Sequence, residues 1–188
     1  MKITGIILAG GKSSRMETDK GLLLLEGIPM IQHVINALKP VVFDIIIVSN
    51  NKEYQQFNYP VFEDLIKEKG PIGGIYTGLS NTKTETNIIV TCDTPFVSSK
   101  LFDFLIKKSI NQQITIPKFN DKIHYLIGVY AKKCLPFLKK AIENNELRVG
   151  FMLQNINSKV IDLSLKDEFD EKTFANINTK EELEQFKK

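Results

Sequence analysis

The chain alternates between short apolar runs and segments in which apolar residues recur every three or four positions. The runs at 6–8, 44–49 and 87–91 are rich in isoleucine and valine and are followed by glycine or polar residues. Such runs predict strands that are buried on both faces, as in a parallel sheet. Weaker runs predict further strands at 61–62, 114–116, 126–130 and 158–162.

Helices are predicted between these runs. A helix opens at Pro29, and its apolar residues recur on one face to about Leu38. Ser98 can cap a second helix, which runs to about residue 109. Thr179 and Glu182 form a capping box for the last helix. The other predicted helices lie at 73–79 and 135–143.

Strand–helix alternation predicts an α/β fold in three layers, with a mostly parallel, twisted sheet covered by helices on both faces. At 188 residues the chain is long enough for a proper core, and no stretch rich in Gly, Ser or Pro divides it. We therefore expect one domain over residues 1–188.

Polar residues follow four of the predicted strands, and each could contact a ligand. They are Gly10-Gly11, Asn50, Asp64 and Asp93. In an open α/β sheet the ligand binds at the carboxyl ends of the strands. The four strand ends therefore predict one shared site.

Composition excludes several classes of protein. The net charge is only +3 and the lysines are scattered, which does not favour a nucleic-acid surface. No run approaches the ~18 apolar residues that a membrane span needs, and no signal peptide is visible. Cys92 and Cys134 lack metal-binding spacing. A reduced, cytoplasmic protein that binds neither nucleic acid nor membrane is expected.

The segment after the first strand has the chemistry of a phosphate-binding loop. Gly10 and Gly11 let backbone N–H groups approach an anion. Arg15 can bind a phosphate through two hydrogen bonds, and Lys20 can act as a point charge. The alternatives are a surface salt bridge for Arg15 and an ordinary surface lysine for Lys20, but their place in the glycine loop favours the phosphate role. A P-loop is excluded, because its first glycine would fall on Ile6. The dinucleotide fingerprint is excluded because the two glycines are adjacent and no third glycine follows at the right distance.

Asp93 is the best candidate for a metal ligand. It directly follows a buried strand, and Mg²⁺ takes a few carboxylates together with phosphate oxygens of a substrate. An aspartate that stabilises a turn or caps a helix is the alternative. Asp64 follows a weaker strand, and an ordinary solvated loop acid fits its position equally well.

Three further segments each have a functional and a structural interpretation. The turn at 70–74 precedes a helix and could bind an anion, or could simply connect two elements. Arg148 could hold a second anion or cap a helix. The amides of Asn176 and Asn178 could contact a heterocycle, but an edge strand followed by the helix cap is favoured on chemistry alone.

Eight segments together carry a resemblance to a known family. They are Leu8-Ala9-Gly10-Gly11, Arg15-Met16, Asp19-Lys20, Glu63-Asp64, Gly70-Pro71-Ile72-Gly73-Gly74, Cys92-Asp93-Thr94-Pro95-Phe96, Arg148-Val149 and Asn176-Ile177-Asn178-Thr179-Lys180-Glu181-Glu182-Leu183. The set resembles the molybdenum cofactor guanylyltransferases, the MobA family of Rossmann-like nucleotidyltransferases. The first motif is shared by many nucleotidyltransferases, whereas the whole set is specific and spans nearly the whole chain.

The resemblance implies roles for individual residues. It implies that the guanine nucleotide is bound by Leu8, Ala9, Gly10, Gly11, Lys20, Asn50, Asp64 and Asp93. It implies that molybdopterin is bound by Arg15, Gly74, Arg148, Asn176 and Asn178. Arg15, Lys20 and Asp93 would be the catalytic residues, and Asp93 would bind Mg²⁺, the implied cofactor.

The implied reaction transfers GMP from GTP to the terminal phosphate of molybdopterin and releases pyrophosphate. GTP and molybdopterin are then the small-molecule partners, and transient contacts with proteins that handle the molybdenum cofactor are implied as well. One alternative is a sister nucleotidyltransferase that uses CTP on molybdopterin or another nucleotide on a sugar phosphate. The other is a non-catalytic nucleotide-binding subunit, favoured by Glu17, which stands where the family's loop usually has glycine.

Overall fold

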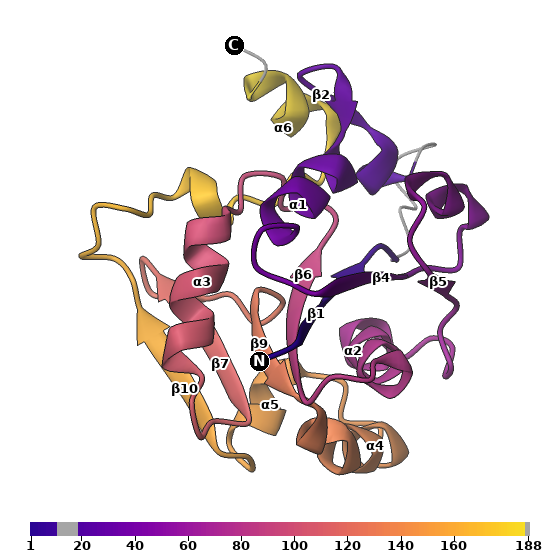
Figure 1. Ribbon diagram of the computed structural model, residues 1–188, viewed down its shortest axis with the longest axis vertical. Coiled ribbons are helices and arrows are strands. Elements are labelled where there is room, and N and C mark those ends of the chain that lie inside the picture. Colours follow the sequence, from indigo (N-terminus) through magenta and orange to yellow (C-terminus); the bar gives the residue numbers. More distant parts are fainter. Residues whose placement is uncertain (11–18, 187–188) are drawn as a thin grey trace.

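The computed structural model describes residues 1–10 and 19–186 and shows a central sheet between two layers of helices (Figure 1). The strands are β1 (Ile3–Leu8), β2 (Leu24–Leu25), β3 (Ile28–Pro29), β4 (Asp44–Val48), β5 (Val61–Phe62), β6 (Thr86–Thr91), β7 (Ile114–Phe119), β8 (Lys122–Ile123), β9 (Gly128–Ala131) and β10 (Ser158–Asp162). The α-helices are α1 (Met30–Leu38), α2 (Gly70–Asn81), α3 (Ser99–Lys108), α4 (Leu135–Glu143), α5 (Val149–Leu153) and α6 (Lys180–Gln185). Short 3-10 helices are η1 (Lys20–Leu22), η2 (Lys52–Phe57), η3 (Lys132–Cys134) and η4 (Lys172–Phe174).

The main sheet has the order β10-β7-β9-β6-β1-β4-β5, with β8 paired to β7. Strand β1 pairs in parallel with β4 and β6, β5 pairs in parallel with β4, and β10 pairs in parallel with β7. Only β8 and β9 run antiparallel to their neighbours in the described part of this sheet. The predicted α/β fold with a mostly parallel sheet is therefore confirmed.

Two hydrophobic cores lie on opposite faces of the sheet. One face packs against α1 and α3, and the other against α2, α4 and α5. Strand β1 is buried along its whole length, with Ile7 facing the first core and Ile6 the second. Figure 1 shows α1 above the strands and α2 and α4 below them. A strand buried on both faces needs apolar residues at every position, which explains the continuous run that predicted it.

Most predicted elements are confirmed, several of them with the same bounds. The helix at 135–143 and the strands at 61–62 and 158–162 lie where the sequence predicted them. Helix α2 begins earlier than predicted, at Gly70, and β9 begins later, at Gly128. Ser98 caps α3 through a hydrogen bond of 3.3 Å from the Leu101 N–H to its hydroxyl.

The prediction of an edge strand at 176–178 is wrong. These residues have no strand conformation, and the Ile177 N–H donates to the Asp93 carbonyl at 2.9 Å. The Thr179 cap is confirmed, since its hydroxyl accepts from the Glu182 N–H at 3.1 Å. The Glu182 carboxylate reaches the Asn178 N–H instead of completing the capping box on Thr179. Residues 176–178 are thus held by hydrogen bonds to Asp93, directly after β6, and to Glu182 of α6.

The sequence did not predict the β2–β3 hairpin or α5. The hairpin turn consists of Glu26 and Gly27, both with positive φ, and its strands are two residues long. Such short strands leave no alternating pattern to detect. Helix α5 has only five residues and begins directly after Arg148, which occupies the N-cap position without a side-chain cap bond.

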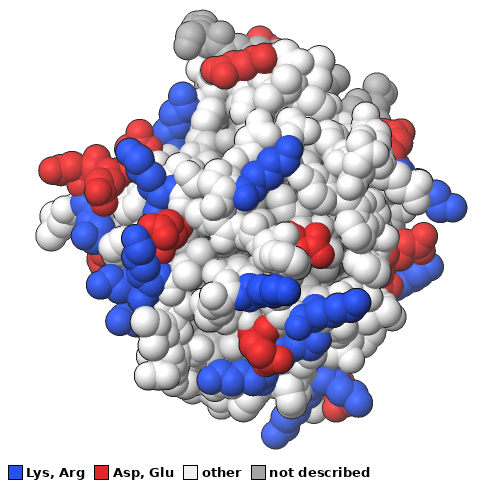
Figure 2. Space-filling view, viewed as in Figure 1, with Lys and Arg blue, Asp and Glu red and all other residues white. Residues whose placement is uncertain are grey.

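Charges on the face drawn in Figure 2 are of both signs, with acidic and basic side chains interspersed over the helices and loops. In the described ranges no helix is long and apolar enough to cross a membrane.

Helix α2 packs against β1 at positions where it carries glycine. A Cβ at Gly78 would lie 2.4 Å from Cγ2 of Ile6, which is fully buried and has no room to move. A Cβ at Gly74, one helical turn earlier, would lie 3.4 Å from Cδ2 of Leu8, an ordinary contact. The two glycines therefore differ in how much they matter for packing.

We expect Gly78→Ala to lower the free energy of unfolding by about 1–3 kcal/mol, because the added methyl overpacks the α2–β1 contact. Gly74→Ala is the matched control, and its stability should be unchanged or higher by up to about 1 kcal/mol, because alanine favours the helix. Urea unfolding of both variants measures the difference. Equal stability of the two variants would contradict this account of the packing.

Candidate functional site

The carboxyl ends of β1, β4, β5 and β6 lie level at one edge of the sheet. Leu8 is in register with Val48 and Thr91, and Val48 with Phe62. Backbone hydrogen bonds continue beyond the strands, from the Ala9 N–H to the Val48 carbonyl at 2.9 Å and from the Cys92 N–H to the Leu8 carbonyl at 3.1 Å. The strand ends that the sequence singled out therefore do meet at one edge.

Asn50 and Asp64 form a reciprocal pair across the ends of β4 and β5. The Asn50 amide donates to Oδ2 of Asp64 at 3.0 Å, and the Asp64 N–H donates to the Asn50 side-chain oxygen at 3.0 Å. The two residues are at least partly exposed. The pair orients a carboxylate toward solvent at the edge of the sheet, where a ligand could reach it.

Lys20 projects toward the C-terminal segment from the start of η1. Its ammonium donates to the side-chain oxygen of Asn178 at 2.8 Å. The side chain of Asp19 caps η1 by accepting from the Gly21 N–H at 3.2 Å. The turn that carries Lys20 is thus fixed at its first residue, and the ammonium is held by a residue distant in sequence.

Asp93 lies half-buried directly after β6, beside the same C-terminal segment. The Asn176 amide donates to its Oδ1 at 3.4 Å, and the Ile177 N–H donates to its backbone oxygen at 2.9 Å. Lys20 and Asp93 are therefore linked to each other through Asn178 and Asn176.

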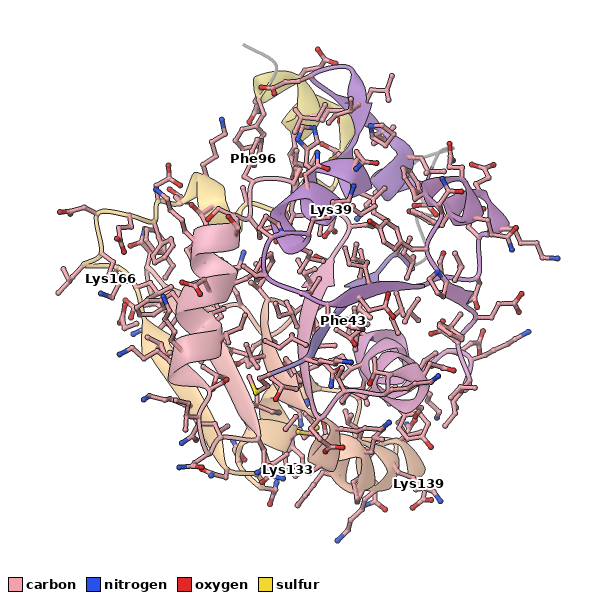
Figure 3. The ribbon with its side chains drawn as sticks, in the orientation of Figure 1. Lys39, Phe43, Phe96, Lys133, Lys139 and Lys166 are labelled. Atoms are coloured by element: carbon pink, nitrogen blue, oxygen red, sulfur yellow. The ribbon has the colours of Figure 1, made fainter. Side chains whose placement is uncertain are left out.

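A small apolar cluster seats the C-terminal segment against the site. Ile177 and Leu183 are buried with Leu25 of β2 and Met30 of α1. The ring of Phe96, three residues after Asp93, packs against the ring of Phe186 with centroids 4.8 Å apart. Figure 3 shows Phe96 directed toward α6. The Lys172 ammonium lies 4.5 Å from the centroid of the Phe96 ring.

Gly74 and Arg148 belong to the other face of the sheet. Gly74 packs on Leu8, and α5, which follows Arg148, packs into the core formed with α2 and α4. The Arg148 side chain is 81% exposed, and its guanidinium donates to Glu146 at 3.1 Å. This hydrogen bonding lowers the pKa of the Glu146 carboxyl. Within the described residues, no hydrogen bond joins Arg148 to Lys20 or Asp93.

Gly11 and Arg15, both predicted site residues, lie outside the described residues, as does Glu17. Gly10 is exposed at the end of β1. A Cβ at Gly10 would meet none of the described atoms within 4 Å.

The donor set around Asp93 fits Mg²⁺ bound together with a substrate. The described residues contain no group of three or more His, Cys, Asp or Glu side chains that could hold a metal by themselves. Mg²⁺ does not need such a group, since it is commonly bound by one or two carboxylates plus substrate phosphates and water. Asn176 engages Oδ1 of Asp93 through a long hydrogen bond, and an oxygen ligand remains for a cation.

The structure reveals a polar cluster behind Lys20 that the sequence did not predict. Tyr54 is fully buried, and its hydroxyl donates to Oδ1 of Asp19. The Asn51 amide donates to Oδ2 of Asp19 at 3.3 Å. Cys92 Sγ lies 3.9 Å from the Tyr54 hydroxyl, and burial raises the pKa of the Cys92 thiol. Asp19 and Cys92 belong to the motifs that carry the family resemblance. Their hydrogen-bonding partners in segment 51–54 belong to no motif, so the sequence did not predict the cluster.

An open α/β sheet with Gly10, Lys20 and Asp93 at the carboxyl ends of its strands is the arrangement of a Rossmann-like nucleotide-binding protein. Residues 5–157 match the family described as the MobA-like NTP transferase domain, and the chain belongs to this family.

Curated relatives agree with this assignment. The chain is 41% identical over 96% of its length to a probable molybdenum cofactor guanylyltransferase of Flavobacterium johnsoniae, of which it covers 94%. It is 34% identical over 96% of its length to the molybdenum cofactor guanylyltransferase of Vibrio parahaemolyticus, of which it covers 93%.

The fold matches molybdopterin-guanine dinucleotide biosynthesis protein A of Archaeoglobus fulgidus with a TM-score of 0.82 and 23% identity, over 98% of this chain and 96% of that one. At this identity the match supports the fold alone.

Proposed function

We propose that this chain transfers GMP from GTP to the terminal phosphate of molybdopterin, releases pyrophosphate, and forms the dinucleotide cofactor. We propose also that residues 1–188 act as one nucleotidyltransferase domain. One observation carries the proposal: Lys20 and Asp93 are linked through Asn178 and Asn176 at the carboxyl edge of the sheet. The names of the relatives that align over nearly the whole chain support the choice of substrates.

The nucleotide would lie along the ends of β1, β4 and β5. Backbone groups of Leu8, Ala9, Gly10 and Gly11 would contact it there, together with Asn50. Asp64, oriented by Asn50, is an acceptor and suits the N–H donors on the edge of guanine. Lys20 would then contact the phosphates at the end of β1.

Positioning and charge neutralisation account for the chemistry. The terminal phosphate of molybdopterin attacks the α-phosphorus of GTP, and pyrophosphate leaves, so the protein needs no nucleophile of its own. Lys20, held by Asn178, would keep a positive charge on the reacting phosphates. Arg15 is proposed as a second cation. Asp93 would hold Mg²⁺, which supplies neutralisation of phosphate charge when bound.

Molybdopterin would lie across the edge of the sheet, between the C-terminal segment on one face and α5 on the other. Asn176 and Asn178 lie next to Asp93 and Lys20, which supports a role for their amides where the acceptor phosphate would meet the nucleotide. Gly74 and Arg148 lie on the α2 and α5 side, and Arg148 is exposed enough to meet an anion. The acceptor would therefore extend from Asp93 toward Arg148.

Two expectations about the cell belong to the same proposal. A cytoplasmic location is supported by Cys92 and Cys134, both buried free thiols, which a reducing compartment preserves. Transient contacts with proteins that handle the molybdenum cofactor are expected, because the product must be passed on to the enzyme that uses it.

We expect GTP to be preferred over ATP, CTP and UTP in the presence of Mg²⁺. Calorimetric titration with each nucleotide, and pyrophosphate release with each nucleotide and molybdopterin, measure this preference. Equal or tighter binding and turnover of CTP would point to the sister cytidylyl activity. GTP binding without any turnover would point to a non-catalytic subunit.

We expect Asp93→Ala to lower turnover well beyond tenfold, a change of more than ~1.4 kcal/mol in the activation free energy, because the metal ligand is lost. Asp103→Ala is the control, since Asp103 is an exposed acid on α3 paired with Lys107. Steady-state kinetics are combined with thermal unfolding to show that both variants stay folded. Activity of Asp93→Ala within tenfold of wild type would mean that Asp93 is not the main metal ligand.

We expect Arg148→Ala to weaken molybdopterin binding about tenfold, because a hydrogen bond to a charged group is lost, and to leave GTP binding unchanged. Glu146→Ala is the matched variant, because it removes the partner of Arg148 but keeps the cation. Paired titrations with GTP and with molybdopterin measure both affinities. Equal losses of molybdopterin affinity in the two variants would show that Arg148 only orders its own loop.

A further inference from the structure

We propose that Tyr54 is a positioning residue for the transfer reaction, which holds the turn carrying Lys20 against the strand end that carries Asp93. Tyr54 belongs to none of the motifs through which the family was recognised, and its hydroxyl is too deeply buried to touch a substrate. The inference rests on the proposed function, in which Lys20 contacts the phosphates of GTP.

The carboxylate of Asp19 is the link between Tyr54 and Lys20. It accepts three hydrogen bonds: from the Tyr54 hydroxyl, from the Gly21 N–H at 3.2 Å and from the Asn51 amide at 3.3 Å. Lys20 is the next residue in the chain, so the direction of its side chain depends on how this turn is held. Two of the three donors come from the segment 51–54 after β4, which is distant from the turn in sequence.

Tyr54 also contacts the other half of the site. Its hydroxyl lies 3.9 Å from Sγ of Cys92, the residue before Asp93. On the far side, Lys20 reaches Asn178, and Asn176 reaches Asp93. The contacts form a closed ring that runs from Tyr54 through Asp19 and Lys20 to the C-terminal segment, and returns through Asp93 and Cys92.

Close packing leaves this arrangement little freedom. A Cβ at Gly21 would lie 2.5 Å from the Tyr54 hydroxyl oxygen and 2.9 Å from Cβ of Cys92. The turn therefore sits directly on both residues. Burial, together with Cys92 and Asp19, raises the pKa of Tyr54, so the hydroxyl keeps its proton and acts as the donor.

Loss of the hydroxyl should act through Lys20. In Tyr54→Phe the ring still fills the core, but Asp19 loses its hydrogen bond from the tyrosine, and the turn can move. Lys20 then spends less time in the position that meets the phosphates. The GTP affinity and kcat/KM should both fall, whereas binding of guanosine, which has no phosphate, should not change.

The test is a double-mutant cycle with Tyr54→Phe, Lys20→Met and the double variant, measured by pyrophosphate release and by titration with GTP and guanosine. We expect Tyr54→Phe to lower kcat/KM about tenfold in the wild-type background and to have little further effect when Lys20 is already replaced. Tyr59→Phe is the matched control, because Tyr59 is half-buried in the same core and the described residues offer its hydroxyl no hydrogen bond.

Any other result contradicts the proposal, and the affinities show whether the role of Lys20 or only the role of Tyr54 fails. If Lys20→Met does not change GTP affinity, the phosphate role of Lys20 fails and the positioning role fails with it. If Lys20→Met weakens GTP binding but Tyr54→Phe does not, or if the two effects simply multiply, only the positioning role fails. Should Tyr54→Phe fold poorly in urea unfolding, Asp19→Asn replaces it, since it keeps the side-chain size and weakens the same hydrogen bonds.

Discussion

The hydrogen bond from the Ile177 N–H to the Asp93 carbonyl joins the C-terminal segment to the end of β6, and the site depends on this junction. Through it Asn176 reaches the Asp93 carboxylate, and Asn178 reaches the Lys20 ammonium. Ile177 itself is buried in the small cluster with Leu25, so apolar packing holds the junction in place. Apolar packing therefore holds the polar side chains of the site in place.

Parallel pairing of β1 with both β4 and β6 is the second constraint. It brings the carboxyl ends of three strands level, and it buries every residue of β1. Backbone groups at the end of a fully buried strand are held rigidly by neighbours on both sides. The backbone that follows at Gly10 therefore starts from a fixed position, and groups that are held in place in advance stabilise a transfer reaction more than mobile groups do.

The proposed chemistry divides naturally between the two faces of the sheet. Lys20 and the 176–178 segment approach the edge from the α1 side, whereas Gly74 and Arg148 belong to the α2 and α5 side. An acceptor that spans the edge would contact both groups, with its phosphate between Lys20 and Asp93. On the first of these sides, the buried Tyr54 would hold the turn that carries Lys20 through its hydrogen bond to Asp19, without contacting the ligand itself.

Local sequence determined the elements and the kinds of residue at the strand ends. Continuous apolar runs and capping residues such as Ser98 act within a few positions, so β1, β4, β6 and α3 could be predicted, as could candidate residues such as Asp93 and Lys20. The resemblance to a family supplied the expected roles. The two-residue hairpin strands could not be predicted, because they leave no periodic pattern.

Only the tertiary structure decided which of these residues meet. The wrong prediction of a strand at 176–178 has this origin, since the backbone of Ile177 finds its partner in Asp93, far away in the chain. The same holds for Tyr54, whose hydroxyl donates to Asp19 although the β2–β3 hairpin, α1 and β4 separate the two residues in the chain. Hydrogen bonds between distant segments leave no trace in local composition, because each partner taken alone is an ordinary polar residue. The chemistry of the site was therefore present in the sequence, and its connectivity was decided by the packing of the fold.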